Sequence, residues 1–141
     1  MIALLASGGA VLLLDQWSKN IVGLLAPGRA ISCAHFLRIR RVTNVNRIYR
    51  NGNTRLVMTL VWFCALASAI LLRSSGSWFQ GQMSLIGLGF ALGGAAGNLL
   101  DIWRNQAVVD FIDLRWWPVF NFADVGIVGG LVLAFAVRLW H

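Results

Sequence analysis

The chain contains no glutamate, and its 141 residues include only five acidic side chains, all of them aspartate. Only 12% of the residues are charged, whereas 58% are hydrophobic and the mean hydropathy is +0.71. This composition is too apolar for an ordinary soluble domain of this length. The sequence therefore indicates an integral membrane protein.

Cysteine and histidine are also scarce, with two residues of each type. Cys64 lies inside a long apolar stretch, so no disulfide framework is expected. Cys33 and His35 are close together, but a zinc site needs a second pair of ligands. We therefore expect no metal and no other cofactor. The HExxH motif of metalloproteases and the GxSxG motif of serine hydrolases do not occur.

Four apolar segments are long enough to cross a hydrocarbon core, which requires about 20 mostly apolar residues. They cover residues 2–25, 56–72, 83–100 and 119–140. A backbone in lipid must satisfy its own hydrogen bonds, and no series of alternating ten-residue strands is visible, so these segments are predicted to be helices. The predicted fold class is an all-α integral membrane protein, with a single domain over residues 1–141 built as a four-transmembrane-helix bundle.

The segments between the predicted helices differ in character. Residues 29–55 form a small extramembrane loop with seven arginines and no acidic residue. Apolar and basic residues partly alternate over 36–42, which predicts a short strand there. Residues 103–118 form a second loop, whose Trp116 and Trp117 suit the headgroup region. A net charge of +7 without a nucleic-acid-binding motif does not indicate nucleic acid as a partner.

The aspartates are the clearest candidates for function, because a carboxylate in or beside a membrane span costs several kcal/mol unless it is paired, solvated or protonated. Asp110 in VVDFID and Asp124 in FNFAD are joined by a proline-containing loop that can bring both to one edge of the bundle. Two neighbouring carboxylates share a proton, so one can activate water while the other protonates a peptide carbonyl. A structural alternative is that Asp110 caps a turn and Asp124 caps the fourth helix.

Other polar residues interrupt the apolar segments. Asp15 and Lys19 are four residues apart on the first predicted helix and can form an ion pair. Asn98 and Asp101 share a face at the end of the third helix and can form a polar floor for the site. Glycines spaced by four residues over 89–97 indicate that this helix packs closely against its neighbours.

Four motifs follow one another along the chain: DQWSK at 15–19, GGAAGNLLD at 93–101, VVDFIDL at 108–114 and FNFAD at 120–124. Together they resemble the lipoprotein signal peptidase family, bacterial signal peptidase II. The resemblance implies a multi-pass aspartic endopeptidase of the bacterial cytoplasmic (inner) membrane. Such an enzyme removes the signal peptides of prolipoproteins on the N-terminal side of a diacylglyceryl-modified cysteine.

The resemblance also implies roles for individual residues. Asp110 and Asp124 would be catalytic. Supporting or substrate-binding roles would fall on a further polar set: Asp15, Lys19, Asn44, Asn98, Asp101 and Asn121. Prolipoproteins and anionic membrane lipids are the expected partners, and we expect a monomer.

Two departures from the family pattern concern the substrate side. Ile102 stands where the family has an arginine directly after the aspartate, and we predict that Arg104 takes its place. In NVNRIY, residues 44–49, Asn44 matches the family, whereas three later residues replace its Gly, Ala and Phe. Two alternatives therefore stay open. One is a paralogue with an intact aspartate pair and a different membrane-anchored substrate, and the other is a non-catalytic lipid- or peptide-binding membrane protein.

The arginines conflict with the positive-inside rule. The family orientation places both loops outside the cell, with nine arginines, and leaves only Arg73 and Arg138 inside, whereas the rule predicts the opposite. We favour the family orientation, with the basic loop lying on anionic headgroups and each arginine contributing on the order of 1 kcal/mol.

Overall fold

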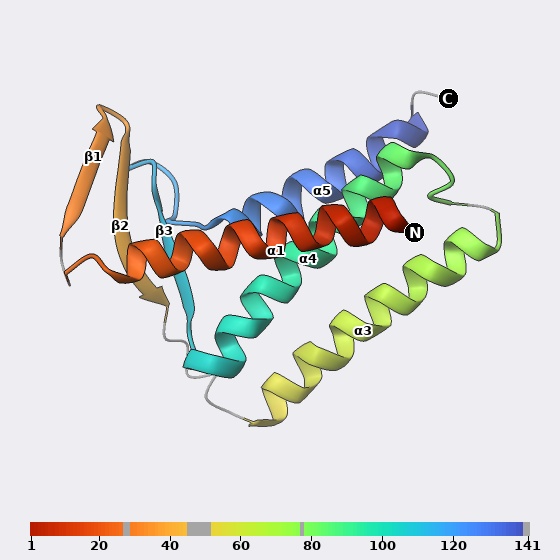
Figure 1. Ribbon diagram of the computed structural model, residues 1–141, viewed down its shortest axis with the longest axis horizontal. Coiled ribbons are helices and arrows are strands. Elements are labelled where there is room, and N and C mark those ends of the chain that lie inside the picture. Colours follow the sequence, from red (N-terminus) through yellow and green to blue (C-terminus); the bar gives the residue numbers. More distant parts are fainter. Residues whose placement is uncertain (27–28, 45–51, 77, 140–141) are drawn as a thin grey trace.

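The computed structural model describes residues 1–26, 29–44, 52–76 and 78–139. The described elements are α1 (Ile2–Gly23), β1 (Ala30–Ala34), β2 (Leu37–Asn44), α3 (Gly52–Ser74), α4 (Gln82–Asn105), β3 (Val108–Asp113) and α5 (Phe122–Leu139). The strands form a small sheet at one end of a bundle of long helices, and the N-terminus lies at the other end (Figure 1). The chain is thus mostly helical, as predicted.

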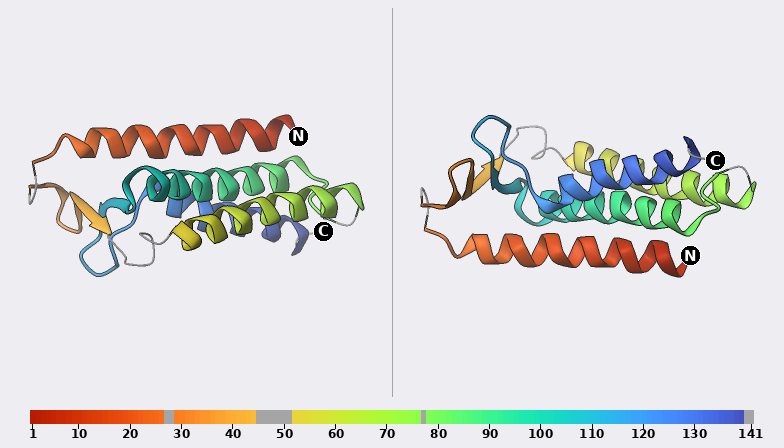
Figure 2. Two further views of the ribbon diagram at one scale, coloured as in Figure 1. Left: turned by 90° about the horizontal axis from the view of Figure 1, so that it is seen from below. Right: turned by 90° about the horizontal axis from the view of Figure 1, so that it is seen from above.

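Glycines allow α4 to approach both α1 and α5 closely (Figure 2). A Cβ atom at Gly93 would collide with the carbonyl oxygen of Gly8 on α1, and one at Gly94 would collide with that of Ala123 on α5. Such close approach strengthens van der Waals packing, which drives helix association in lipid. The predicted packing role of the glycines is confirmed.

The α3 helix stands apart from this three-helix core, as Figure 1 shows. Ala69 is its only described buried residue. Two indole groups link α3 to α4: Trp62 Nε1 donates to Leu92 O at 3.0 Å, and Trp103 Nε1 donates to Thr59 Oγ1 at 3.0 Å. Since the other apolar side chains of α3 are exposed or half-buried, a hydrocarbon environment suits this helix.

Hydropathy separates the helices into two groups. Among the described residues, α3 and α4 are long and apolar enough to cross a membrane, whereas the apolar stretch of α5, Phe122–Ala136, is shorter. The buried polar residues Asp15 and Lys19 lower the hydropathy of α1. Length and composition therefore identify two spans among the described residues, compared with the four that the sequence predicted.

The sheet has the order β1-β2-β3, and both pairings are antiparallel. The strand predicted over 36–42 is confirmed as part of β2. The prediction of a loop over 103–118 is wrong for Val108–Asp113, which pairs with β2 so that Asp110 lies opposite Val42. Five of the six β3 residues are buried, so both faces of the strand are covered and the sequence shows no polar–apolar alternation.

The helix boundaries also differ from the predicted ones. The helices cover 2–23, 52–74, 82–105 and 122–139 rather than 2–25, 56–72, 83–100 and 119–140. The largest difference is at α4, which continues to Asn105 and ends where Gln106 adopts a left-handed conformation with φ 53°. Arg104 therefore lies on a helix and not in a loop.

Candidate active site

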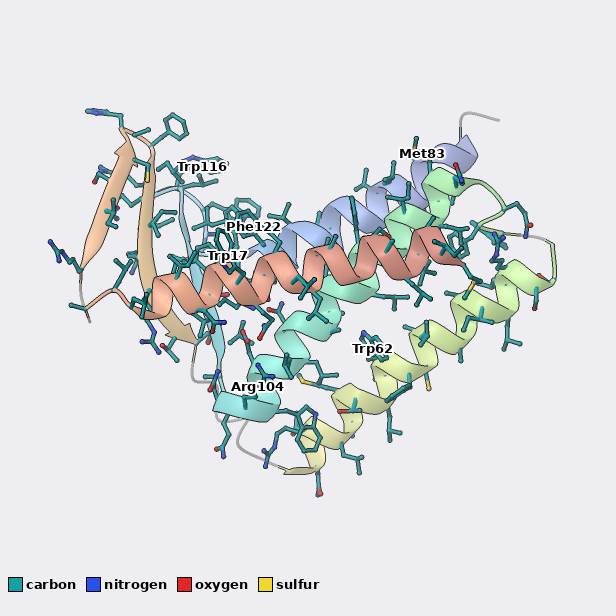
Figure 3. All side chains as sticks on the ribbon, viewed as in Figure 1. Trp17, Trp62, Met83, Arg104, Trp116 and Phe122 are labelled. Carbon is teal, nitrogen blue, oxygen red and sulfur yellow. The ribbon has the colours of Figure 1, made fainter. Side chains whose placement is uncertain are left out.

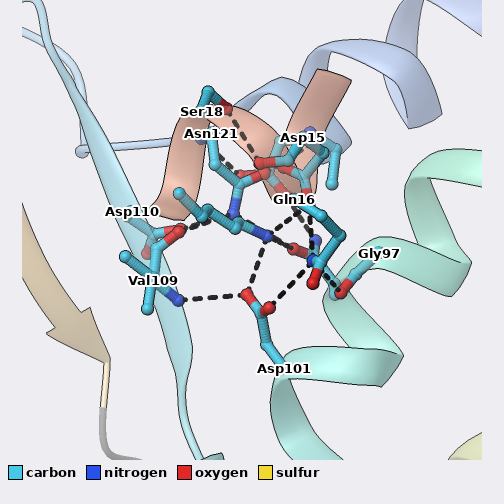
Figure 4. Close-up of polar contacts among 12 residues, drawn as sticks. Asp15, Gln16, Ser18, Gly97, Asp101, Val109, Asp110 and Asn121 are labelled. Carbon is cyan, nitrogen blue, oxygen red and sulfur yellow. Dashed lines mark hydrogen bonds and ion pairs between the residues drawn. The ribbon is translucent and has the colours of Figure 1, made fainter. Parts of the chain in front are cut away.

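Polar side chains gather at the sheet end of the bundle, where α1, α4, β3 and α5 meet (Figure 4). Four aspartates are buried there, with exposed fractions of 0% for Asp15, 3% for Asp101, 8% for Asp110 and 2% for Asp113. Asp124, in the first turn of α5, is half-buried. Buried carboxylates need partners, so each hydrogen bond in this cluster bears on its chemistry.

Lys19 is the cationic centre of the cluster. Its Nζ lies 2.7 Å from Asp15 Oδ2 and 2.7 Å from Asp101 Oδ2, and it also donates to Asn98 Oδ1 at 3.1 Å. The predicted pair of Asp15 and Lys19 is confirmed, and so is the placement of Asn98 and Asp101 on one face of α4. One lysine thus compensates two buried carboxylates from different helices.

Asn121 connects the two aspartates that were predicted to form a pair. Its Nδ2 donates to Asp110 Oδ1 at 2.8 Å and to Asn98 Oδ1 at 3.0 Å. Its Oδ1 accepts the backbone N–H of Asp124 at 2.9 Å, and its own N–H donates to Asp124 Oδ2 at 3.1 Å. This reciprocal arrangement is a capping box at the start of α5. Asp110 and Asp124 therefore lie at the same edge of the bundle, as the sequence predicted.

Asp124 has a second partner besides its role as a helix cap. Asn98 Nδ2 donates to Asp124 Oδ1 at 2.9 Å. Because Lys19 and Asn121 both donate to Asn98 Oδ1, the amide of Asn98 is held with its N–H₂ group toward Asp124. The alternative prediction that Asp124 caps the fourth helix is thus correct. Capping does not, however, account for the hydrogen bond between Asp124 and Asn98.

Asp15 joins α1 to the start of α5. Its Oδ1 accepts the backbone N–H of Ala123 at 2.9 Å, which satisfies a donor in the first turn of that helix. Gln16 was not among the predicted site residues, yet its Nε2 donates to Asp101 Oδ1 at 3.0 Å and to Asp15 Oδ2 at 3.2 Å. Its position three residues before Lys19, on the same helical face, is the signal that could have revealed it.

The two aspartates of VVDFID occupy opposite environments. Burial, and secondly the charge of Asp124, raise the pKa of Asp110 from 3.8 to about 6, although Lys19 and the hydrogen bond from Asn121 partly offset this. The backbone N–H of Arg115 and the side chain of Arg40 lower the pKa of Asp113. Asp113 Oδ2 also lies 2.9 Å from Arg38 Nη2 and 2.6 Å from Arg40 Nε. Asp110 therefore keeps its proton to a higher pH than an ordinary aspartate does, whereas Asp113 is ion-paired with two arginines of the sheet.

Two predicted site residues lie outside the central cluster. Asn44 is exposed at the end of β2, opposite Val108. Arg104 is exposed, and its Nη1 lies 3.5 Å from Gln16 Oε1. Residues 45–51, which include the altered part of NVNRIY, lie outside the described residues. The structure therefore places Arg104 at the edge of the polar cluster, next to Gln16, and not beside Asp110 and Asp124.

An apolar cavity of about 480 Å³ leads to the cluster between α3, α4 and α5. Asn98 is the one amide side chain in its lining, and buried Ile102 lines the same cavity one helical turn further on. Since Asn98 donates to Asp124, the polar end of the cavity meets the aspartate pair. If a hydrocarbon chain occupied the cavity, the polar group attached to that chain would lie beside these carboxylates.

Fold and site together define a mostly helical membrane protein in which Asn121 is hydrogen-bonded to two aspartates beside an apolar cavity. The profile of the signal peptidase (SPase) II family matches residues 8–140, and the chain belongs to this family. It is 34% identical to the lipoprotein signal peptidase of Mycolicibacterium smegmatis over 154 residues, covering 97% of this chain and 61% of that protein. It is 36% identical to the lipoprotein signal peptidase of Rhodococcus jostii over 141 residues, covering 93% and 69%.

The fold is similar to that of a solved bacterial membrane enzyme, with a TM-score of 0.80 and 22% sequence identity, covering 96% of this chain and 92% of the other. The chain spans about 61 to 69% of the length of the two relatives named above. The match to the family nevertheless covers nearly the whole chain.

Proposed function

We propose that the protein is an aspartic endopeptidase that removes signal peptides from lipid-modified prolipoproteins before the diacylglyceryl cysteine. The observation that carries this proposal is the set of hydrogen bonds by which Asn121 joins Asp110 to Asp124. Membership of the signal peptidase II family supports the choice of substrate.

The proposed mechanism assigns different protonation states to the two carboxyl groups. Asp110 is the protonated member, because burial and the charge of Asp124 raise its pKa to about 6. Asp124 is the ionised member, since it accepts hydrogen bonds from Asn98 and from the N–H of Asn121 and lies at a helix N-terminus. Asp124 takes a proton from water, which attacks the peptide carbonyl, while Asp110 donates its proton to the carbonyl oxygen. The proton on Asp124 then passes to the leaving amine as the C–N bond breaks, and a hydroxyl group of the tetrahedral intermediate returns a proton to Asp110.

The proposed setting is the bacterial inner membrane, with all four helices spanning it and the sheet end outside. The charges of α1 support this proposal, because Asp15 and Lys19 face α4 and α5 rather than lipid. The described arginines of the sheet end include exposed Arg29 and Arg41, while the described aspartates are buried or hydrogen-bonded. That surface is therefore cationic, and anionic headgroups are its proposed partner. The protein is proposed to act as a monomer.

The direct test is cleavage of a prolipoprotein by purified protein. The substrate carries a diacylglyceryl group on its cysteine, and release of the signal peptide is followed on gels. Asp110→Asn and Asp124→Asn should each abolish release, and the double variant should lose little more, because residues that act as a unit are not additive. Asp113→Asn is the matched control from the same strand and should still cleave. Near-normal turnover by Asp124→Asn would exclude the proposed pair.

A further inference from the structure

Trp62 bridges the space between α3 and α4 near the middle of α3, and Figure 3 shows its side chain between the two helices. The indole N–H donates to the carbonyl oxygen of Leu92 at 3.0 Å. An indole N–H without a partner would be costly in a hydrocarbon environment, so this bond fixes the orientation of the ring. Trp62 therefore acts as a fixed brace between the helices.

Three apolar cavities meet at this ring. One of about 480 Å³ lies toward α5, one of about 280 Å³ lies toward Trp103, and one of about 230 Å³ lies toward α1. Trp62 belongs to the lining of all three. The ring thus lies at the boundary of all three cavities.

Only the largest of the three cavities reaches the candidate active site through the residues that line it. Asn98, which donates to Asp124, belongs to its lining, whereas the linings of the other two contain no member of the polar cluster. A chain lying on the α5 side would place its attached group beside the aspartates. A chain on the α1 side would be separated from them by Trp62 and α4.

The chemistry of the 480 Å³ cavity favours a hydrocarbon chain over a peptide. Apart from Asn98, its lining is apolar, and the helices that form it already use their backbone groups internally. An extended peptide there would leave backbone N–H and C=O groups unpaired, whereas an acyl chain has no such groups.

We propose that Trp62 determines specificity by confining an acyl chain of the substrate's diacylglyceryl cysteine to the cavity on the α5 side. This inference rests on the proposed function, because it takes the substrate from there. Trp62 touches no reacting atom. Its role is to keep the acyl chain out of the other two cavities, because a chain bound there would hold the scissile bond too far from Asp124.

The test uses a lipopeptide that resembles the product and cannot be cleaved. It begins with diacylglyceryl cysteine and carries a photoreactive diazirine at the end of one acyl chain, and crosslinks are located by mass spectrometry. In the unchanged protein, crosslinks to Ile127 and Leu131 on the α5 side should exceed those to Leu5 and Leu12 on the α1 side by about tenfold, equivalent to about 1.4 kcal/mol. Trp62→Ala should make the two sides nearly equal. Trp62→Phe, which keeps a ring, should retain most of the preference.

Two results would overturn the inference: crosslinks mainly on the α1 side in the unchanged protein, or the same crosslink pattern in Trp62→Ala and the unchanged protein. If Trp62→Ala does not fold, Trp62→Leu takes its place, because it removes the ring but keeps a large apolar side chain, and it should likewise make the two sides nearly equal. Binding is measured without cleavage. Failure of the proposed peptidase activity would appear only in the cleavage assay, so the two failures can be distinguished.

Discussion

Asn121 should control the pH range in which the aspartate pair works. Its side chain is fully buried, and its Nδ2 donates to Asp110 Oδ1 at 2.8 Å, a bond that stabilises the ionised carboxylate and lowers its pKa. Hydrogen bonds to charged groups contribute about 1.5–3 kcal/mol. Since 1.36 kcal/mol corresponds to one pKa unit, loss of this bond should raise the pKa of Asp110 by about one to two units.

The informative substitution is Asn121→Ser. A serine hydroxyl can still cap α5 by accepting the N–H of Asp124, but it is too short to bridge to Asp110. The proposed mechanism needs one proton on the pair, so activity should fall as pH rises through the pKa of Asp110, which is about 6 in the unchanged protein. In Asn121→Ser this alkaline limb should move to between about pH 7 and 8. Asn121→Ala should show the same shift and also lose about 0.5–2 kcal/mol of stability with the cap.

The assay is the pH dependence of kcat/KM for cleavage, which reports the groups of the free enzyme. The position of the limb is independent of the maximal rate, so a variant with weak activity is still informative. Asp113→Asn serves as the control, because Asp113 is paired with arginines, and the limb should stay in place. An unchanged limb in Asn121→Ser, or a shift to lower pH, would refute the assignment of the shared proton to Asp110.

Three further predictions concern Lys19, the orientation in the membrane and Arg104. Lys19→Met leaves two buried carboxylates without their cation and should lower the free energy of unfolding by about 3–5 kcal/mol, measured by denaturation in mixed micelles, whereas Lys19→Arg should lose less. In Cys64→Ser, exposed Cys33 on β1 should react with an impermeant thiol reagent added to intact cells. Labelling of Cys33 only after the membrane is opened would reverse the proposed orientation. Arg104→Ala should lower kcat/KM about tenfold, equivalent to about 1.4 kcal/mol, through its contact with Gln16, whereas Ile102→Arg places a charge in the apolar cavity and should not restore the activity. A silent Arg104→Ala would favour a different substrate.

The sequence predicted the parts of the site that local spacing determines. Asp15 and Lys19 are four residues apart, and Asn98 and Asp101 are three apart, so helical periodicity alone places each pair on one face. The structure confirms both placements through the contacts of Lys19. The long apolar runs likewise predicted helices, because their composition does not depend on which neighbours they pack against.

Features that depend on partners distant in the sequence were not predictable in the same way. The strand character of VVDFID arises from pairing with β2 and from burial on both faces, and neither is visible in a run of six residues. The position of Trp62 between three cavities depends on how α3 packs against α4, which the sequence of α3 alone does not reveal. The central position of Asn121 also depends on three segments meeting, although its place directly before an apolar helix marks it as a cap.

Arg104 illustrates how an error in one boundary changes a chemical argument. A predicted helix ending near residue 100 leaves Arg104 in a loop, free to turn toward the position of the arginine replaced by Ile102. In the structure α4 continues to Asn105, so residues 102 and 104 point about 200° apart. Ile102 faces the apolar cavity below Asn98, while Arg104 reaches Gln16 on α1. The contacts of Arg104 thus lead to the acidic cluster through Gln16 and Asp101, and Gln16→Ala should reproduce the effect of Arg104→Ala if that route operates.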